Sequence, residues 1–395
     1  MITVASALDR ILASARQLEA AEVPLAAALD CVLRDTVSAP DDSPPFDASA
    51  MDGYAMRRAD LPGPVRVIGT AAAGAGFAAA VGAGECVRIL TGAPVPAGAD
   101  CVIRQEDAAR EGDNVRGLRP TEASHIRRRG ENRRAGDCIV AAGTRLGPPE
   151  LAALAAAGVH RPRVTRRPRC VHLVTGNELV APDRTPVGAQ IRDSNSTLIA
   201  ALLARQGAEL AASVRVGDDP AEARAAVETM PAHDVLLVSG GAGAGDHDIA
   251  QPLLEALGYT FHFRQVNLRP GKPLLFASRG DRLAFALPGN PVSHWVVFQL
   301  FLAPLLVHLQ TGAGRPPRRL SGRLAAGGPP PPSDTRHTFW PCRTDVVAGV
   351  HEITPLPLAS SGDASGLVGA NALLPVPPPP GSLSPGQTAE FIPCP

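Results

Sequence analysis

The sequence predicts a multidomain protein of the α/β plus β class, with a central, mostly parallel α/β domain, an inserted β-rich module and a small C-terminal β domain. Strand-like and helix-like segments alternate over residues 169–312, and the continuously apolar strand Val235–Val238 suits a sheet covered on both faces. Residues 41–140 instead contain short β-like runs between Gly, Pro and Asp turns. The length of 395 residues leaves room for several such domains.

Helical patterns flank the β-rich module. Apolar residues at helical spacing predict an amphipathic helix over residues 4–20, and PPELAALAAAG predicts a second helix over 148–158. Residues 1–40 and 141–168 are therefore expected to form one helical, linking domain. Within the module, 41–140, strands are predicted at Val65–Ile68, Cys86–Leu90, Cys101–Arg104 and Cys138–Val140.

The central domain, 169–312, follows a strand and helix order. Strands are expected at 170–175, 210–216, 234–241, 260–268 and 273–287, and helices at 194–207, 220–230, 248–257 and from 291. Crossover helices make the core of such a sheet parallel, and ligands then bind at the carboxyl ends of its strands. Residues 311–334 are interpreted as a Pro- and Gly-rich linker with one strand inside, and a β-like tail completes the C-terminal domain, 313–395.

Composition excludes several classes of protein. The 38 basic side chains balance 38 acidic ones, so nucleic acid is not an expected partner. Seven cysteines without a CxxC pair predict neither a disulfide framework nor a zinc cluster, and favour a cytoplasmic location. Charge or proline interrupts every apolar stretch of eighteen residues, and Asp9 and Arg10 interrupt the first apolar run, so neither a membrane partner nor a signal sequence is expected.

Unusual polar segments recur where the central strands are expected to end. A glycine-rich turn leaves backbone N–H groups free, so Ser239, Gly240 and Gly241 are predicted to cradle an anion or phosphate, with a flexible connector as the alternative. Such endings are expected to converge on one rim of the sheet. The segments are TGNEL (175–179), VGDDP (216–220), SGGAGAGDHD (239–248), RPGKP (269–273) and LPGNPVS (287–293).

Three carboxylates, those of Glu178, Asp218 and Asp248, fall on this expected rim. Clustered carboxylates repel one another unless a divalent cation lies between them, and their oxygen ligands favour Mg²⁺. The alternative is that the two aspartates cap helices and the glutamate is a solvated surface residue.

The rim also carries two cations, Arg269 and Lys272, beside a Pro-Gly turn, and Lys272 is the only lysine in the chain. Two cations on a rigid turn suit a small tetrahedral oxyanion, for which the planar fork of arginine does not replace a compact ammonium. Mutational bias towards arginine codons is the alternative account of the single lysine. Ser293 is expected to donate to the same anion or to cap a helix, and Asn290 to bind there or to hold its own turn.

Two motifs in the module are ambiguous by pattern alone. PPFDASAMDGYAM (44–56) contains an Asp-Gly turn, which by itself predicts a tight hairpin. RRRGENRR (127–134) holds five arginines, which either form a solvated face or attract a phosphorylated ligand.

Taken in order, PPFDASAMDGYAM, RILTGAPVP (88–96), RRRGENRRAGD, TGNEL, SGGAGAGDHD, RPGKP and LPGNPVS resemble the molybdopterin molybdenumtransferase family, to which the E domain of gephyrin also belongs. The resemblance implies a cytoplasmic homodimer that inserts molybdenum from molybdate into adenylylated molybdopterin and releases AMP with the help of Mg²⁺. It implies molybdopterin adenylyltransferase and apo-molybdoenzymes as partners.

The same resemblance implies roles for single residues. Glu178, Asp218 and Asp248 match the metal-binding acids, and Arg269, Lys272 and Ser293 match positions around molybdate. Asp52 and Thr91 match the aspartate of MDGYA and the threonine of TGAPVP, and Asp52 is expected to reach the site from another domain or from the partner subunit.

The sequence departs from the family pattern at Asn132, Asn177, Gly243 and Gln265, each of which lacks a charge or hydroxyl usual there. The family's arginine in the tail is sought near Arg343, where no motif fixes it. Two other functions stay open: a molybdopterin adenylyltransferase, against which the β-rich module argues, and a diverged protein that binds the pterin without turnover.

Overall fold

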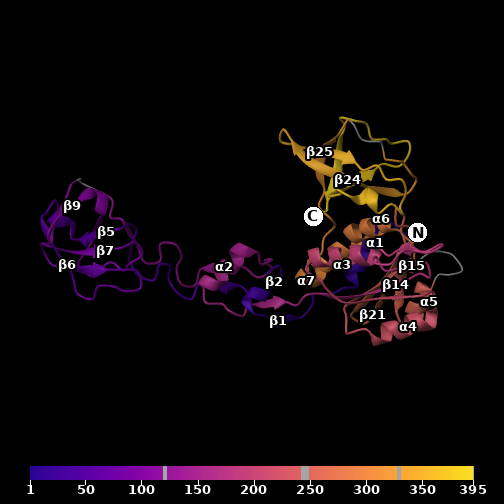
Figure 1. Ribbon diagram of the computed structural model, residues 1–395, viewed down its shortest axis with the longest axis horizontal. Helices are drawn as coiled ribbons and strands as arrows, with labels where there is room; N and C mark the ends of the chain where they lie inside the picture. Colours follow the sequence, from indigo (N-terminus) through magenta and orange to yellow (C-terminus); the bar gives the residue numbers. More distant parts are fainter. Residues whose placement is uncertain (119–121, 242–248, 327–330, 395) are drawn as a thin grey trace. The chain divides into compact units, whose positions relative to one another are not determined.

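The computed structural model describes residues 1–118, 122–241, 249–326 and 331–394 of the chain (Figure 1). The chain divides into two compact units. The large unit consists of Met1–Glu22, Asp30–Val32 and Arg163–Pro395, and the small unit of Val23–Leu29 and Leu33–Pro162. The finer, four-domain division expected from the sequence stays a prediction.

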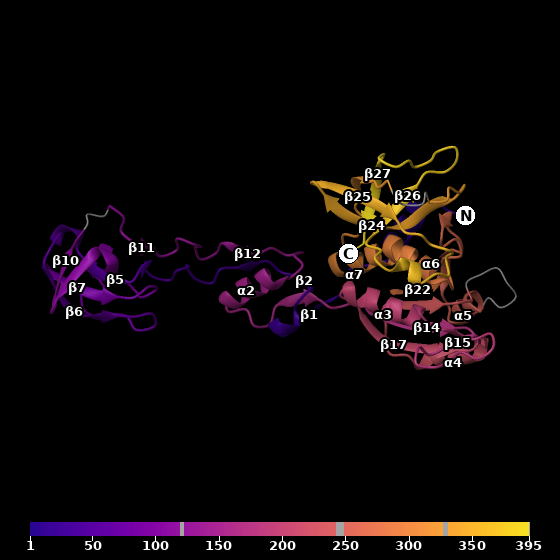
Figure 2. The same cartoon turned by 45° about the horizontal axis from the view of Figure 1, so that its top comes forward.

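The small unit is built on a six-stranded sheet with the order β8-β5-β7-β6-β10-β9 (Figure 2). Alternate residues of β5 pack on opposite faces, Ala55 in one apolar cluster and Tyr54 and Met56 in the other, as the two-residue period of a strand requires. The predicted strands Cys101–Arg104 and Cys138–Val140 have these bounds in the structure. The elements are β3 (Val37–Ser38), β4 (Ala48–Ser49), β5 (Gly53–Met56), β6 (Val65–Ala71), β7 (Glu85–Ile89), β8 (Cys101–Arg104), β9 (Ala108–Glu111), β10 (Asn114–Gly117), β11 (Ile126–Arg127), β12 (Cys138–Val140) and α2 (Pro148–Ala156).

The large unit contains the predicted α/β sheet, with the strand order β17-β14-β18-β22-β21-β19. The strands β17, β14, β18 and β22 pair in parallel, whereas the pairings of β22 with β21 and of β21 with β19 are antiparallel. The strands are β14 (Arg169–Thr175), β17 (Glu209–Val216), β18 (Val235–Ser239), β19 (Thr260–Phe263), β21 (Leu275–Arg279) and β22 (Arg282–Leu287). The helices are α1 (Val4–Ala13), α3 (Asn195–Arg205), α4 (Pro220–Thr229), α5 (Ala250–Ala256), α6 (Pro291–Val297) and α7 (Ala303–Thr311).

Helices cover both faces of this sheet, as the apolar strand Val235–Val238 predicts. Val235 and Leu237 pack into the cluster that includes residues of α1, α3, α6 and α7, whereas Leu236 and Val238 pack into the cluster with α4 and α5. Figure 1 shows α4 and α5 on the opposite side of the sheet from α3 and α6. Alternate side chains of one strand therefore serve two apolar cores.

The helices α6 and α7 are joined by a π-helical turn, Phe298–Leu302. Within the described residues, the resulting helix Pro291–Thr311 is the one with the length and apolar character of a membrane span, and 83% of its most apolar window is buried inside the fold. It is a core helix of the large unit, because it supplies apolar side chains such as Phe298 and Leu305 to the main cluster.

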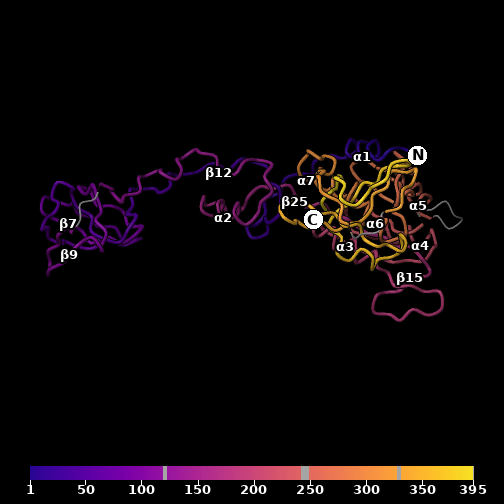
Figure 3. The backbone as a smooth tube through the Cα atoms, turned by 90° about the horizontal axis from the view of Figure 1, so that it is seen from above, coloured from indigo at the N-terminus to yellow at the C-terminus, as the bar shows by residue number. Residues whose placement is uncertain are grey.

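The C-terminal residues form strands that lie above the α/β part in Figure 2, and Figure 3 shows their yellow trace from above. The order is β20-β24-β25-β23-β27-β26, and β26 also pairs with β24, which closes a small barrel. Strand β20 comes from the central part of the chain and pairs in parallel with β24. The strands are β20 (Leu268–Arg269), β23 (Leu320–Leu324), β24 (His337–Val347), β25 (Val350–Pro355), β26 (Ala372–Val376) and β27 (Thr388–Pro393).

Most predicted elements differ from the structure by a few residues at their ends, and three differ more strongly. The first helix ends at Ala13 rather than at residue 20, because the Leu18 N–H donates to the carbonyl of Leu309 (2.8 Å) and the chain continues into β1 (Ala20–Glu22), which pairs with β13 (Arg163–Thr165). The segment 260–268 is divided between β19 and β20, which belong to different sheets. The segment 273–287 is a hairpin of β21 and β22.

Candidate active site

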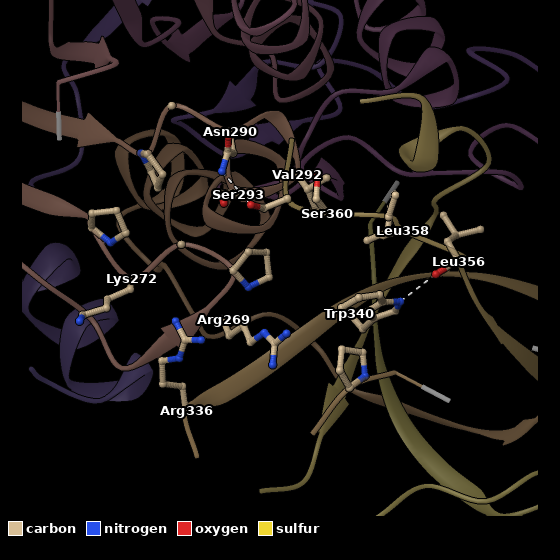
Figure 4. A pocket seen from close by; sticks show the side chains of 18 of the residues that line it. Arg269, Lys272, Asn290, Val292, Ser293, Arg336, Trp340, Leu356, Leu358 and Ser360 are labelled. Atoms are coloured by element: carbon tan, nitrogen blue, oxygen red, sulfur yellow. Dashed lines mark hydrogen bonds between the residues drawn. The ribbon is translucent and has the colours of Figure 1, made fainter. Parts of the chain in front are cut away.

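A pocket of about 580 Å³ lies in the large unit, beside the turns that follow β20 and β22 (Figure 4). Arg269, Lys272, Asn290 and Ser293, which the sequence places in two separate motifs, all line this pocket. The C-terminal part of the chain contributes further lining residues. Its polar and aromatic lining residues are Arg336, Trp340, Ser360 and Ser361.

Three cations and one carboxylate set the charge of this pocket. Asp334 accepts hydrogen bonds from Arg269 (2.9 Å) and from two guanidinium nitrogens of Arg336 (2.7 and 2.9 Å). These bonds, chiefly those from Arg336, hold the pKa of the Asp334 carboxyl well below its usual range. Asp334 therefore stays ionised and orients both guanidinium groups, and together with Lys272 they leave an excess of positive charge.

Arg336 is a candidate site residue that the sequence pattern does not identify. The sequence does not fix the tail arginine near Arg343, and Arg343 pairs with Asp345 (2.8 Å) on β24 and is not among the residues that line the pocket. Arg336 lies just before β24, and the pairing of β24 with β20 brings it beside Arg269. No local spacing rule links residues 269 and 336, so only the barrel topology identifies Arg336.

Ser293 lies in the first turn of α6, and Asn290 is the N-cap residue of this helix. The capping alternative for the Ser293 side chain is wrong, since the helix begins at Pro291 and Ser293 is inside it. Asn290 does not hold its own turn through its side chain, because its amide donates to the Ser361 hydroxyl (2.7 Å). Both residues line the pocket, and the Ser293 hydroxyl is a candidate donor to an anion there.

The ends of β14 and β17 lie side by side, as their parallel pairing requires. The Asn177 N–H donates to the Asp218 carboxylate, and the Asp218 N–H donates to the Asn177 side-chain carbonyl, both at 3.2 Å. The Asn177 side chain accepts the same hydrogen bond from the Asp218 N–H that an aspartate at this position would accept. Compared with an aspartate, it places one negative charge fewer next to Asp218. Asp218 and Glu178 therefore come from neighbouring strand ends.

The first residues of the glycine-rich segment meet the end of β14. A Cβ on Gly240, which has a φ of +92°, would lie 2.4 Å from the Thr175 carbonyl oxygen, so this position requires glycine. Gly241 also has a positive φ. Ser239 differs from its expected role, because its hydroxyl is buried between His172 and His294 and is not exposed to a ligand. A cradle at this turn would therefore use the backbone of Gly240 and Gly241.

The predicted metal site is only partly within the described residues. Asp248 and Gly243 lie outside them, in 242–248. Over the described part of the chain, no group of three or more His, Cys, Asp and Glu side chains is placed to hold a metal ion. Glu178 and Asp218 supply carboxylate oxygens at adjacent strand ends, which is the donor chemistry that Mg²⁺ prefers, so these residues fit that ion.

In the small unit, the structure brings together Asp52 and Thr91. The Asp52 carboxylate accepts hydrogen bonds from the Thr91 N–H and hydroxyl, both at 2.7 Å, and they lower the pKa of Asp52. The hairpin predicted for residues 44–56 is wrong, because β4 pairs with β11 whereas β5 pairs with β7 and β8. The Asp-Gly sequence instead opens a central strand and leaves the Asp52 carboxylate exposed beside Thr91.

Two of the five arginines in the run 127–134 form ion pairs with local acids. Arg128 pairs with Asp47 (2.6 Å) and Arg129 with Asp42 (2.7 Å). Glu131 accepts a hydrogen bond from the Arg128 N–H (2.8 Å). These contacts favour a solvated, ion-paired face over a phosphate site.

Three family models match successive parts of the chain. They are the MoeA N-terminal region (domain I and II) at residues 2–158, the probable molybdopterin binding domain at 172–308 and the MoeA C-terminal region (domain IV) at 324–394. The α/β part, the C-terminal barrel and the pocket described above thus lie in a chain that belongs to the MoeA family.

Individual relatives agree with this assignment. The chain is similar to a molybdopterin molybdenumtransferase of Synechococcus elongatus, with 36% identity over 78% of this chain and 80% of the relative. A protein of the same name from Staphylococcus aureus is 28% identical over 99% of this chain and 95% of the relative. The crystal structure of a molybdopterin biosynthesis MoeA protein from Pyrococcus horikoshii matches with a TM-score of 0.83 and 27% identity, covering 100% of this chain and 99% of that one.

Proposed function

We propose that this protein is a molybdopterin molybdenumtransferase, which inserts molybdenum from molybdate into adenylylated molybdopterin and releases AMP. The observation that carries the proposal is the pocket whose lining includes Arg269, Lys272, Arg336 and Ser293. Convergent cations and a hydroxyl donor are the groups that a tetrahedral dianion requires.

Each lining residue has a distinct part in holding molybdate. Lys272 supplies a compact ammonium, which approaches one oxygen of the anion as a point charge. Arg336 and Arg269 supply planar guanidinium groups, whose orientation is fixed by Asp334. Ser293 donates its hydroxyl. These groups hold the oxyanion in one orientation, so that a dithiolene sulfur of the pterin can replace its oxygens without a further search.

The pterin phosphates are assigned to the rim at the strand ends. The turn at Gly240 and Gly241 approaches a ligand without side chains, and Glu178, Asp218 and Asp248 would hold Mg²⁺ beside the phosphates. When bound, Mg²⁺ supplies positive charge that offsets the negative charge of the departing AMP. The reaction then needs little covalent participation by the chain, whose residues bind and align two substrates.

The assay that tests the proposal uses the full chain with adenylylated molybdopterin and molybdate, with and without Mg²⁺. AMP release and the activation of an apo-molybdoenzyme by the product are expected, and Lys272→Ala is expected to abolish activation. Arg343→Ala is the matched control, because Arg343 is a cation of the same part of the chain outside the pocket. Pyrophosphate formation from ATP and molybdopterin would instead indicate an adenylyltransferase, and binding without AMP release would indicate a carrier.

The proposal includes a cytoplasmic homodimer that receives its substrate from a molybdopterin adenylyltransferase and delivers its product to apo-molybdoenzymes. The cytoplasmic location is supported by the seven free cysteines, six of them buried, because free thiols suit a reducing compartment. Asp52 belongs to the small unit and the other acids to the large unit. Mixing Asp52→Ala subunits with Glu178→Gln subunits is expected to restore partial activity if the partner subunit supplies Asp52, and no recovery in verified heterodimers would contradict that arrangement.

A further inference from the structure

Three polar side chains are buried in line between the sheet and α6. Ser239, the last residue of β18, has its hydroxyl oxygen 2.6 Å from Nε2 of His172 on β14 and 2.7 Å from Nε2 of His294 on α6. His172 and His294 have no solvent exposure, and Ser239 is 1% exposed. Buried polar groups at such short distances form a defined hydrogen-bonded chain, because no water competes for them.

The direction of this chain follows from its last partner. Nδ1 of His294 lies 3.2 Å from the Asn290 carbonyl oxygen, which only accepts, so Nδ1 carries the hydrogen. Burial lowers the pKa of His294 to about 4, so the ring is neutral near pH 7 and its Nε2 accepts the Ser239 hydroxyl hydrogen. The Ser239 oxygen must then accept from Nε2–H of His172.

The first ring agrees with this order. Burial lowers the pKa of His172 to about 3, so this ring is also neutral, and a hydrogen on Nε2 leaves Nδ1 bare. Nδ1 of His172 is indeed a buried atom with no hydrogen-bond partner in the described chain. The acid that acts on both rings, Asp193, is itself buried and accepts hydrogen bonds from Ser196, and Arg215 lies 4.0 Å from it. The order therefore runs from His172 through Ser239 and His294 to Asn290.

The two ends of the chain lie at different parts of the proposed site. Ser239 immediately precedes Gly240 and Gly241, the turn assigned to the pterin phosphates. Asn290 and its neighbour Gly289 both line the oxyanion pocket. The Asn195 amide donates a hydrogen bond to the Gly289 carbonyl (2.7 Å). Hydrogen bonds to the consecutive carbonyls of Gly289 and Asn290 thus fix the loop at the oxyanion pocket. The Asn290 carbonyl is connected to the phosphate turn through His294 and Ser239.

We propose that His172, Ser239 and His294 are positioning residues that hold the phosphate turn and the oxyanion pocket in fixed alignment. The inference rests on the proposed function, since it concerns how two bound substrates are aligned. None of the three side chains touches substrate in this scheme. Their effect is on the rate of the joint reaction, because small displacements between reacting groups lower the rate more than they lower the affinity of either substrate.

The first test measures the tautomers and needs no turnover. Nitrogen-15 NMR of the full-length protein is expected to show His172 with its hydrogen on Nε2 and His294 with its hydrogen on Nδ1, both unchanged between about pH 6 and 8. The opposite tautomer of either ring, or a protonated ring in this range, overturns the proposed chain. This result is independent of whether the protein inserts molybdenum.

The second test separates positioning from binding. In Ser239→Ala, both hydrogen bonds of the hydroxyl, to His172 and to His294, are lost. The turnover rate at saturating substrates is therefore expected to fall by about tenfold or more, while the KM for molybdate changes less than about twofold. Ser278→Ala is the matched control, because it removes a serine to histidine hydrogen bond (2.8 Å, to His262) on β21, away from the pocket. Equal losses of turnover in both variants, or an unchanged rate in Ser239→Ala, contradict the proposal. Inactive wild-type protein would contradict the proposed function instead. The tautomers of His172 and His294 would still test whether the hydrogen-bonded chain exists.

Discussion

Two regions of the molecule contain several arginines and differ in how many carboxylates pair with them. In the run 127–134 of the small unit, Arg128 and Arg129 each have a carboxylate of their own, on Asp47 and Asp42. In the pocket of the large unit, two arginines share the single carboxylate of Asp334, and Lys272 lies on the same pocket. An anion site is therefore indicated by converging charges that exceed their local counter-ions, and not by the number of arginines in a stretch of sequence.

The largest expected effect concerns the single lysine. Lys272→Arg is expected to weaken molybdate binding about ten- to hundredfold although the charge is kept, because the planar fork does not reproduce the compact ammonium at the turn. An amine-selective reagent reports on the same contact, since Lys272 is the only lysine, and molybdate should protect it but not the N-terminus. Wild-type affinity in Lys272→Arg together with unprotected labelling would attribute this lysine to codon bias.

A somewhat smaller effect is expected for the missed arginine. Arg336→Ala removes one cation and leaves Asp334 with a single guanidinium partner, so molybdate affinity should fall about tenfold by calorimetry. Arg343→Ala provides the comparison, with wild-type affinity expected. If the two variants bind molybdate equally well, the tail arginine of the site is not Arg336.

The third prediction concerns two buried side chains that are neutral in the folded protein, the imidazoles of His172 and His294. His172 and His294 have their pKa lowered by burial from 6.5 to about 3 and about 4, so the unfolded chain binds more protons than the folded one between pH 6.5 and 4. The contribution of these two histidines to the free energy of unfolding is therefore expected to be complete above pH 6.5 and to decrease as the pH falls towards 4. Melting temperatures at pH 7, 6 and 5 measure this, and His172→Gln should make the decrease shallower. An equally steep decrease in the variant would assign the pH dependence to other groups.

The smallest effect is expected in the arginine-rich run. Arg129→Ala breaks an exposed ion pair with Asp42, so molybdate affinity and turnover should change less than about twofold. A tenfold loss of turnover in this variant would show that the run meets a substrate, and the contrast between the two regions would fail.

The sequence alone determined the fold class, and it identified two motifs that line the candidate pocket. Continuous apolar strands alternating with helical segments specify a sheet covered on both faces, and Val235–Val238 divides its side chains between the two cores as that pattern requires. Polar and glycine-rich segments at strand ends marked the rim, and RPGKP and LPGNPVS do meet at one pocket. Such features are local, because periodicity and turn chemistry act over a few residues.

Only the tertiary structure decided which residues separated along the chain act together. Arg336 joins Arg269 because β24 pairs with β20, and the Ser239 hydroxyl lies between two histidines that come from β14 and α6. The first helix stops at Ala13 because the next segment finds hydrogen bonds elsewhere in the unit. Pairings of this kind depend on which strands and helices become neighbours when the core is buried, and residue spacing carries no record of that choice.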